Sequence, residues 1–215
     1  HCAGHGVHLV NTNYARVAGC YVTDVQYYGI YLEAQNAQFY GDAVVSGNRI
    51  NRTGDIAGAA GGGIKVKGYS STERQVRVTV NGNAVALPNG ATSDTCRAIE
   101  MENCAYCAIT GNVTTLGAVG ICVNASFDVA VSGNAVHSPR AIGLEATGST
   151  NFSFAGNTVS GATTTDFGAK LVNSYRCVVN SNNIHECDTG INVTANTAIT
   201  VDHLAIVGNM VRDTT

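Results

Sequence analysis

A short motif that recurs along the chain constrains its fold more than any other feature. The motif has the form Val-x-Val-x-Gly-Asn-x-Val, in which apolar and polar positions alternate. Its successive Asn residues are 35, 29, 22, 23, 25 and 27 positions apart. Repeats of this length are typical of solenoids, in which each copy stacks on the one before it. The copies lie at Gly47-Asn48, Gly82-Asn83, Gly111-Asn112, Gly133-Asn134, Gly156-Asn157, Ser181-Asn182 and Gly208-Asn209, after a degenerate first copy at Gly19-Cys20.

The apolar residues of the motif keep fixed distances from its Asn. One set lies five residues before the Asn, a second lies three before it, and a third lies two after it. The period of two predicts short β-strands, and the shared positions predict that the strands are parallel and stack in columns. The three sets are Val129, Phe152, Cys177 and Leu204; Val131, Phe154, Val179 and Ile206; and Val136, Val159, Ile184 and Val211.

The Gly-Asn pair has a predicted role at the corner between two strands of a coil. Such a corner needs a residue with positive φ, which Gly and Asn tolerate better than other residues. Stacked coils lie about 4.8 Å apart, so Asn side chains at equivalent corners are within hydrogen-bonding reach of one another. We therefore expect an internal ladder of asparagines along the solenoid.

Composition and the absence of competing patterns favour the same fold class. The chain has 215 residues, of which 45% are hydrophobic, so it is able to bury a core. Hairpin signals between long strands are missing, which disfavours a β-sandwich, and the Leu-x-x-Leu-x-Leu pattern of leucine-rich repeats is absent. The net charge is −3 and no long apolar run occurs, so neither nucleic acid nor membrane insertion is expected.

The eight cysteines are predicted to be free thiols rather than a disulfide framework. Disulfide-dense scaffolds are short and poor in core residues, which does not describe this chain. Cys104 and Cys107 form a CxxC pair, but no second pair lies at the spacing of a zinc ribbon. We therefore expect no metal site and no cofactor, and a chain that folds in a reducing cytoplasm.

The repeat resembles that of the right-handed parallel β-helix superfamily, which includes pectate lyases, polygalacturonases and bacteriophage tailspikes. The resemblance extends over positions 1–215 and implies one all-β domain, a single-stranded right-handed parallel β-helix of about eight coils. Stretches near 52–63 and 87–95 interrupt the spacing and are predicted insertion loops. The chain starts at His1 and shows no cap helix, so we expect flanking domains or neighbouring subunits of a larger protein to cover its ends.

Fixing the apolar columns predicts which side chains face outward on one sheet. In the recurring Gly-Ile-x-Val-x segment, both x positions point to solvent because side chains alternate along a strand. A third outward position lies two residues before the Ile. The first x column contains Tyr31, Lys65 and Glu100; the second contains Glu33, Lys67, Glu102 and Glu145; and the third position contains Tyr28, Arg97 and Arg140.

This face carries the candidate site. The Cα atoms of Glu100 and Glu102 are expected about 6.6 Å apart, and those of Glu102 and Glu145 about 9.6 Å apart across two coils. Both separations suit carboxyl pairs that cleave glycosidic bonds, so Glu102 and Glu145, with Glu100 in reserve, are the candidate catalytic residues. The alternative is a solvated ladder of Glu–Lys pairs without a ligand. The candidate substrate-binding residues are Glu33, Lys65, Lys67, Arg97, Arg140, Tyr28 and Tyr31.

Three functions are compatible with the sequence. The resemblance implies a carbohydrate-interacting β-helix, and the first hypothesis is a phage tailspike domain, trimeric and displayed on the virion, that binds or cleaves bacterial surface polysaccharide. The second is a secreted, monomeric polysaccharide lyase or glycoside hydrolase. The third is a non-catalytic adhesin or structural spacer. From the resemblance we therefore expect a protein on a virion surface or outside the cell, with polysaccharide as its partner, and enzymatic activity is left open.

Overall fold

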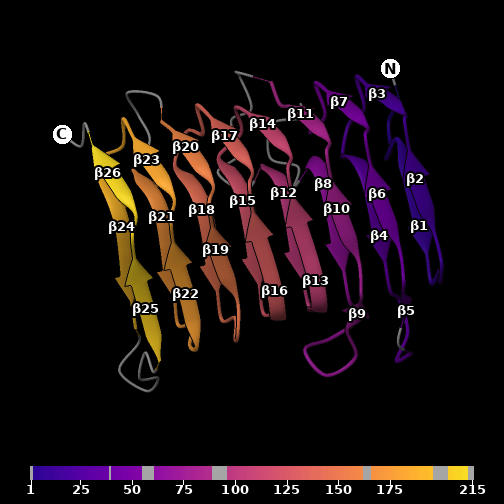
Figure 1. Cartoon of the computed structure of the whole chain (residues 1–215). Helices are drawn as coiled ribbons and strands as arrows, with labels where there is room; N and C mark the ends of the chain where they lie inside the picture. The colour runs from indigo at the N-terminus through magenta and orange to yellow at the C-terminus, as the bar shows by residue number, and fades with distance from the viewer. Residues whose placement is uncertain are drawn as a thin grey trace.

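The computed structural model describes residues 2–38, 40–54, 61–88, 96–161, 166–195 and 203–212. Within these ranges the chain forms strands and turns and no helix, so no described segment could cross a bilayer as a helix. The strands pair in parallel with those of the coils before and after (Figure 1). The protein is therefore an all-β, right-handed parallel β-helix, as its repeat predicts.

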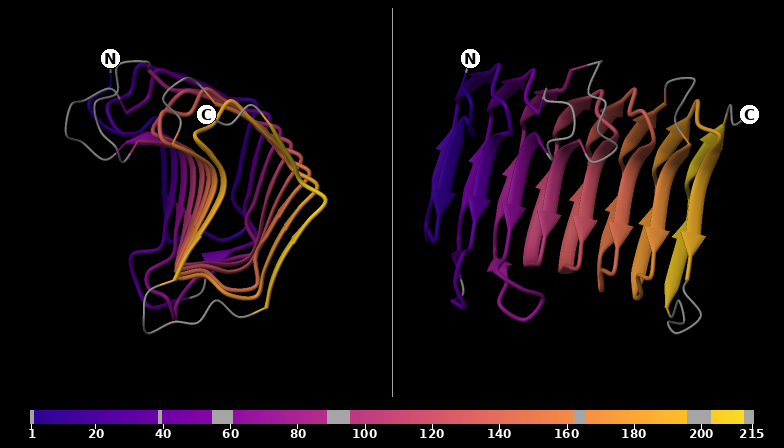
Figure 2. Two further views of the ribbon diagram at one scale, coloured as in Figure 1. Left: turned by 90° about the vertical axis from the view of Figure 1, so that its left-hand side faces the viewer. Right: turned by 180° about the vertical axis from the view of Figure 1, so that it is seen from behind.

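Each coil contributes strands to three sheets, which form three sides around the interior (Figure 2, left). The first and third sheets each have eight strands, in line with the predicted number of coils. The first sheet contains β1 (Val7–Val10), β4 (Tyr28–Glu33), β8 (Gly62–Lys67), β12 (Arg97–Glu102), β15 (Val119–Asn124), β18 (Ile142–Thr147), β21 (Phe167–Val172) and β24 (Thr189–Thr194). The second contains β2 (Arg16–Ala18), β5 (Tyr40–Gly41), β6 (Val44–Ser46), β9 (Gln75–Val76), β10 (Thr79–Asn81), β13 (Cys104–Thr110), β16 (Phe127–Ser132), β19 (Ser153–Ala155), β22 (Cys177–Asn180) and β25 (Leu204–Val207). The third contains β3 (Tyr21–Thr23), β7 (Arg49–Asn51), β11 (Ala84–Ala86), β14 (Val113–Thr115), β17 (Ala135–His137), β20 (Thr158–Ser160), β23 (Asn183–His185) and β26 (Met210–Arg212).

The predicted apolar columns form the core. Val136, Val159 and Ile184 pair in register on the third sheet and are fully buried. On the second sheet, Val131, Phe154 and Val179 pair in the same way, and Val129, Phe152 and Cys177 are buried beside them. In the last described coil, two of the three equivalent residues are open to solvent, with Ile206 45% and Val211 43% exposed, and Leu204 is partly buried. Burial of each column therefore depends on a coil on both sides.

The Gly-Asn pair occupies a corner, as predicted. The residue before each Asn has positive φ, at Gly133 and Gly156 for example, and at Ser181 where the repeat departs from Gly. The Asn side chains form a continuous ladder through the interior. Asn134 Nδ2 donates to Asn157 Oδ1 at 2.9 Å and to the carbonyl of the preceding coil, and the same pattern runs from Asn48 to the last rung. The ladder satisfies polar groups that would otherwise be buried without partners.

A second, shorter ladder lies at the corner between the first and second sheets. The backbone N–H of Cys104 donates to Ser126 Oγ, that of Ser126 to Ser149 Oγ, and that of Ser149 to Ser174 Oγ. The hydroxyls in turn donate to backbone carbonyls at the same corner. Only three consecutive coils carry the serine, so this ladder leaves no repeat that is recognisable in the sequence.

A column of glycines precedes the apolar position of the first sheet. It contains Gly120, Gly143 and Gly168, and a Cβ at Gly143 would lie 2.4 Å from Val159 Cγ1 and 2.6 Å from the carbonyl oxygen of Gly168. The first and third sheets meet at this corner, and the third-sheet apolar side chain fills the space that a Cβ would need. At Gly143 glycine is therefore required by packing rather than by φ, whereas Ala98 occupies the same column on β12.

Three further predictions concern the cysteines, the insertion loops and the domain organisation. The structure contains the free thiols of Cys2, Cys20, Cys104, Cys107, Cys122, Cys177 and Cys187, in agreement with the prediction. Of the predicted insertion loops, positions 55–60 and 89–95 lie outside the described residues. That positions 1–215 are one domain of a larger protein stays a prediction.

Candidate functional site

The outward face of the first sheet brings most of the predicted site residues together. In one column Tyr31, Lys65 and Glu100 are neighbours on β4, β8 and β12, and in the next column Glu33 and Lys67 are neighbours in the same way. These residues form two connected clusters of charged side chains, centred on Glu100 and on Glu33.

Glu100 is the centre of the first cluster and is only 1% exposed. Its carboxylate accepts ion pairs from Lys65 Nζ at 3.1 Å and Arg97 Nη1 at 3.2 Å, and the Tyr28 hydroxyl lies 3.5 Å from it. The prediction that Glu100 points freely to solvent is therefore wrong. It faces outward, but the two cations and the tyrosine ring lie against it.

Lys65 joins the two carboxylates of β12, because its Nζ also lies 2.8 Å from Glu102 Oε2. Burial acts to lower the pKa of Lys65, but the carboxylates of Glu100 and Glu102 raise it above its ordinary value, so the lysine stays charged. Burial, together with Glu100, raises the pKa of Tyr28 to about 12. The tyrosine is thus a neutral hydrogen-bond donor in this cluster.

Glu33 is the centre of the second cluster. Its carboxylate accepts hydrogen bonds from the Tyr31 hydroxyl and from Gln35 Nε2, both at 2.8 Å, and lies 3.4 Å from His8 Nε2 and 3.9 Å from Lys67 Nζ. Burial acts to raise the pKa of Glu33, but these hydrogen bonds together hold it below its ordinary value. Burial and the Glu33 carboxylate raise the pKa of Tyr31.

Tyr28 and Tyr31 do not offer open rings to a ligand, since they are only 6% and 8% exposed. That they bind substrate stays a prediction, and their ring faces are covered in this structure. Each ring packs against a histidine from the first coil: His8 stacks on Tyr31 at 4.9 Å, and His5 lies 5.8 Å from Tyr28. Their role in the structure is to hold the carboxylates in place.

His5 is a member of this face that the predicted site left out. Its Nδ1 accepts a hydrogen bond from the backbone N–H of Tyr28 at 3.2 Å, which places the ring proton on Nε2 in the neutral form. Burial, and secondarily His8, lowers the pKa of His5. The signal for both histidines was their position in the outward columns directly before Tyr28 and Tyr31.

The predicted pair of Glu102 and Glu145 is wrong in register. Glu145 pairs with Cys122, which pairs with Glu100, so Glu145 belongs to the Glu100 column, while Thr147 occupies the column of Glu102. Cys122 Sγ donates to Glu145 Oε2 at 3.5 Å. Glu145 therefore lies two coils from Glu100 with a buried thiol between them.

The predicted position of Arg140 is wrong by the same shift of two positions along the chain. It precedes β18, and the residue that follows Arg97 by two coils in its column is Ile142 rather than Arg140. Ile142 instead belongs to a small apolar cluster with Ala118, Val119 and Cys122. The outward face thus changes from a charged network on β4, β8 and β12 to apolar residues beside the single carboxylate of Glu145 on β15 and β18.

The central ion pairs give a stability prediction. Replacing Glu100 by Gln leaves Arg97 without its carboxylate in a buried site, and the expected loss in the free energy of unfolding is about 3 kcal/mol. Glu102→Gln is the matched control, because its side chain is 24% exposed and surface pairs contribute about 1 kcal/mol or less. Urea denaturation measures both, and equal losses would contradict the central role of Glu100.

The fold and this face define the class of the protein: a parallel β-helix with an ordered polar network on its first sheet. A family model described as "Periplasmic copper-binding protein (NosD)" matches residues 59–211, and the chain belongs to this family. No curated protein matches the chain.

Solved structures with the same fold include the periplasmic alginate epimerase AlgG. The TM-score is 0.74 at 12% identity, over 97% of this chain and 47% of AlgG; its T265N T268M double mutant gives 0.72 at 13% identity. The enzymatically active domain of tailspike protein 2 from bacteriophage CBA120 gives only 0.41 at 15% identity, over 97% of this chain and 39% of that domain. The chain spans about half the length of AlgG, and at these identities the similarity shows the fold alone.

The copper in the family description finds no matching ligand set in the described part of the chain. No group of three or more His, Cys, Asp or Glu side chains converges there on a point that could hold a metal ion. Cys104 and Cys107 are buried, and no third His, Cys, Asp or Glu side chain joins them among the described residues to complete a metal-binding group. The described residues therefore do not fit a copper centre.

Proposed function

We propose that this protein binds polysaccharide along the outward face of β4, β8 and β12. The observation that carries the proposal is the network around Glu100 and Glu33, in which cations and carboxylates hold one another in place. Burial of Glu100 gives a structural reason for the centre of this network, but Lys67 and Glu102 are partly exposed, and exposed ion pairs of this kind stabilise proteins very little, so stability alone does not account for the order of these outer side chains.

The network suits hydroxyl-rich ligands. A sugar hydroxyl both donates and accepts, so it is recognised by neighbouring acceptors and donors that are already oriented. Lys67, Arg97 and Glu102 retain 34%, 26% and 24% exposure of their side chains, and each is anchored through a partner that is more deeply buried. The similarity of fold to an alginate epimerase agrees with a polysaccharide ligand.

The carboxylates serve binding rather than hydrolysis in this proposal. A glycosidase pair needs one carboxyl that donates a proton, and here Lys65 is an ion-pair partner of both Glu100 and Glu102. Glu145 does not face Glu102. We therefore assign Glu33, Glu102, Lys67 and Arg97 to ligand contact, and Glu100 and Lys65 to positioning.

A location outside the cytoplasm is part of the proposal, because both the family and AlgG are described as periplasmic. The tailspike role and the homotrimer stay predictions from the sequence.

The test is a binding panel of capsular, lipopolysaccharide and cell-wall glycans, with new reducing ends measured in parallel. We expect binding to at least one polysaccharide without chain cleavage. Lys67→Ala and Glu102→Gln should each weaken that binding about tenfold, since each removes a charged hydrogen bond. The control is Arg49→Ala on the third sheet, which should have no effect. Absence of binding across the panel, or an equal loss in the control, would refute the proposal.

A further inference from the structure

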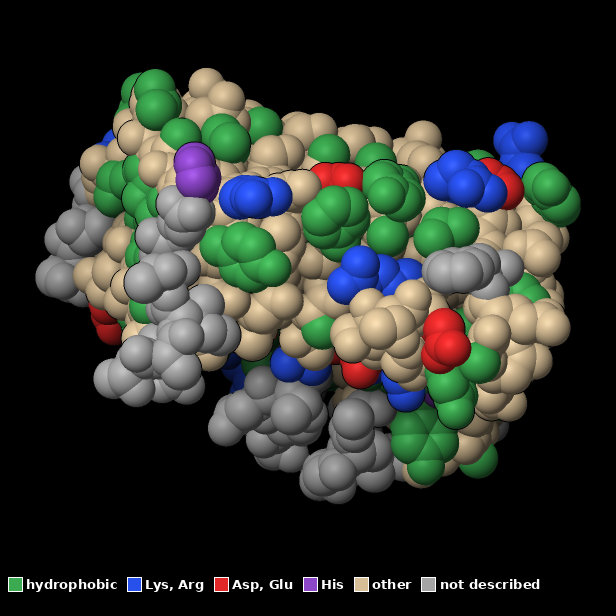
Figure 3. Space-filling model, turned by 90° about the horizontal axis from the view of Figure 1, so that it is seen from below, with side chains coloured by type: hydrophobic (Ala, Val, Ile, Leu, Met, Phe, Trp, Pro, Cys, Tyr) green, Lys and Arg blue, Asp and Glu red, His purple; other side chains and the backbone are tan. Residues whose placement is uncertain are grey.

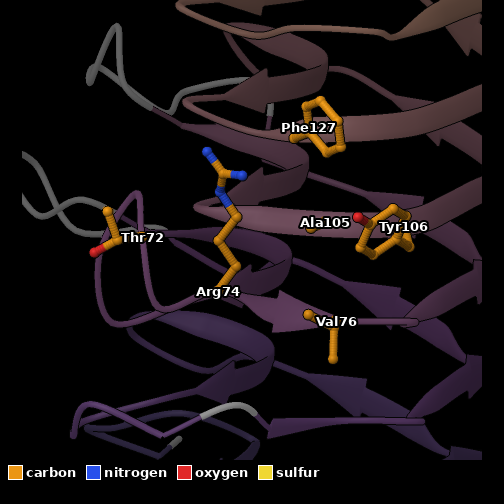
Figure 4. A pocket seen from close by; sticks show the side chains of 6 residues that line it. All are labelled: Thr72, Arg74, Val76, Ala105, Tyr106 and Phe127. Carbon is orange, nitrogen blue, oxygen red and sulfur yellow. The ribbon is translucent and has the colours of Figure 1, made fainter.

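A hollow of about 220 Å³ lies at the corner between the first and second sheets, and no residue of the Glu100 and Glu33 clusters lines it. From below, Figure 3 shows hydrophobic and basic side chains next to one another along this edge of the solenoid. The lining residues are Thr72, Arg74, Val76, Ala105, Tyr106 and Phe127 (Figure 4).

The hollow combines a cation with two aromatic rings. The Arg74 guanidinium carbon lies 5.7 Å from the centre of the Phe127 ring, and the Tyr106 ring meets Phe127 edge-on at 5.8 Å. Tyr106 is 60% exposed. Arg74 Nε is shielded from solvent and has no hydrogen-bond partner among the described residues, and no described carboxylate forms an ion pair with this arginine. A guanidinium nitrogen that is shielded from water and lacks an acceptor favours the binding of an anion beside it.

The segment before β9 fixes the position of Arg74. Ser70 Oγ accepts hydrogen bonds from the backbone N–H groups of Thr72 and Glu73, and the backbone N–H of Ser70 donates to the carbonyl of Glu73. Gly68 allows the chain to return closely on itself, because a Cβ there would lie 2.1 Å from the carbonyl oxygen of Asn103. Arg74 is thus held by a folded turn rather than by a free loop.

We propose that this hollow binds a single pyranose residue that carries a carboxylate, as in a uronic acid. The carboxylate would accept hydrogen bonds from the Arg74 guanidinium, whose planar fork matches two oxygens. The apolar face of the sugar ring would lie against Phe127 and Tyr106, and the Thr72 hydroxyl would bond a ring substituent. The volume is below that of sites for drug-sized ligands, which suits one ring rather than several.

The same edge repeats this combination further along the solenoid. Phe127, Thr150 and Tyr175 are paired in register through β-bridges, so the two rings lie in one column about 9.6 Å apart. Tyr175 is 40% exposed, and the next residue, Arg176, lines a shallow groove of about 400 Å³ on the second sheet. Two aromatic rings in line, with Arg74 beside the first, fit a polysaccharide that runs parallel to the solenoid axis and places an acidic residue at the hollow.

The experiment uses the intact chain and two small probes, methyl β-D-glucuronide and methyl β-D-glucoside, which differ in the carboxylate. Backbone amide shifts in NMR titrations report where and how tightly each binds. We expect the glucuronide to shift the amides of Ala105 and Phe127 with a millimolar Kd, and the glucoside to bind at least fivefold more weakly. Glucuronide binding should be lost in Arg74→Met, which keeps the stem, and weakened in Tyr106→Asn, which suits the positive φ of 56° at this position.

Lys67→Ala separates this proposal from the function proposed above, because it should leave glucuronide binding at the hollow unchanged. Equal affinity for both probes, unchanged binding in Arg74→Met, or shifts confined to β4, β8 and β12 would each overturn the assignment. Loss of polysaccharide binding in Lys67→Ala with intact glucuronide binding supports two separate sites.

Discussion

Replacing Asn134 by alanine is expected to lower the free energy of unfolding by about 4 kcal/mol. The side chain donates to the Ile109 carbonyl at 3.0 Å and to Asn157 Oδ1 at 2.9 Å, and its own Oδ1 accepts from the backbone N–H and the Nδ2 of Asn112. Its removal leaves several buried donors and acceptors unpaired, and each such group costs about 1–3 kcal/mol. Water does not replace these bonds easily, because Asn112 and Asn157 are at most 1% exposed.

Asn209→Ala is the matched control for this substitution. Asn209 is the last described rung of the same ladder and accepts the same pair of hydrogen bonds from Asn182, but it is only partly buried. Solvent can therefore reach the orphaned groups, and we expect a loss of about 1 kcal/mol. Both values come from urea denaturation followed by circular dichroism. Similar losses at the two positions would show that burial of a rung does not increase the contribution of its hydrogen bonds to stability.

Gly143→Ala is the second substitution with a large expected effect, a destabilisation of about 3 kcal/mol or more. The added Cβ would overlap Val159 Cγ1 on one side and the Gly168 carbonyl oxygen on the other. Val159 is fully buried and the carbonyl belongs to the next coil, so neither can move without disturbing the core. Overpacking of a closed core typically costs 1–3 kcal/mol, and contact with backbone leaves less room for adjustment.

The control lies in the same coil. Gly156 has a φ of +62° and no heavy atom within 4 Å of a Cβ, so Gly156→Ala meets only the backbone penalty of about 1 kcal/mol. Thermal unfolding of both variants distinguishes the two reasons for which this repeat uses glycine. A larger loss at Gly156 than at Gly143 would mean that the corner conformation, and not the packing of the first sheet against the third, limits stability.

The features that the sequence predicted correctly are those that every coil repeats. The asparagine ladder and the buried columns follow from residues such as Asn134 and Val136, which recur at constant positions relative to one another. Each repeat therefore indicates separately which positions are buried and which form the corner, and insertions between repeats do not change that assignment.

The error at Glu145 has a physical cause in the glycine column. Aligning Ile142 with Ile121 places Glu145 beside Glu102, whereas the structure pairs Ile121 with Leu144. The residue that fixes the register is Gly143, because a Cβ at this position would overlap Val159 and the Gly168 carbonyl oxygen where the first sheet meets the third. The glycine, rather than the larger apolar residue after it, was the informative signal in the sequence.

The repeat pattern does not predict that Glu100 is buried. Lys65 and Tyr28 reach Glu100 from β8 and β4 with long side chains that cross between coils, and Arg97 reaches it along β12 itself. None of these three residue types occupies its position in two consecutive coils. The alternation of a strand predicts which side a residue faces, but not what lies against it on that side.

The asparagine ladder also makes the length of this molecule adjustable. Each rung offers its neighbours the same donors and acceptors, so the coil between Asn134 and Asn157 begins and ends on equivalent chemistry. Excising those 23 residues, or duplicating them, would shorten or lengthen the rod by about 4.8 Å while both end surfaces stay the same. Adding or removing whole coils can thus change the distance between the two ends of the solenoid in fixed increments, while the packing of the core stays the same.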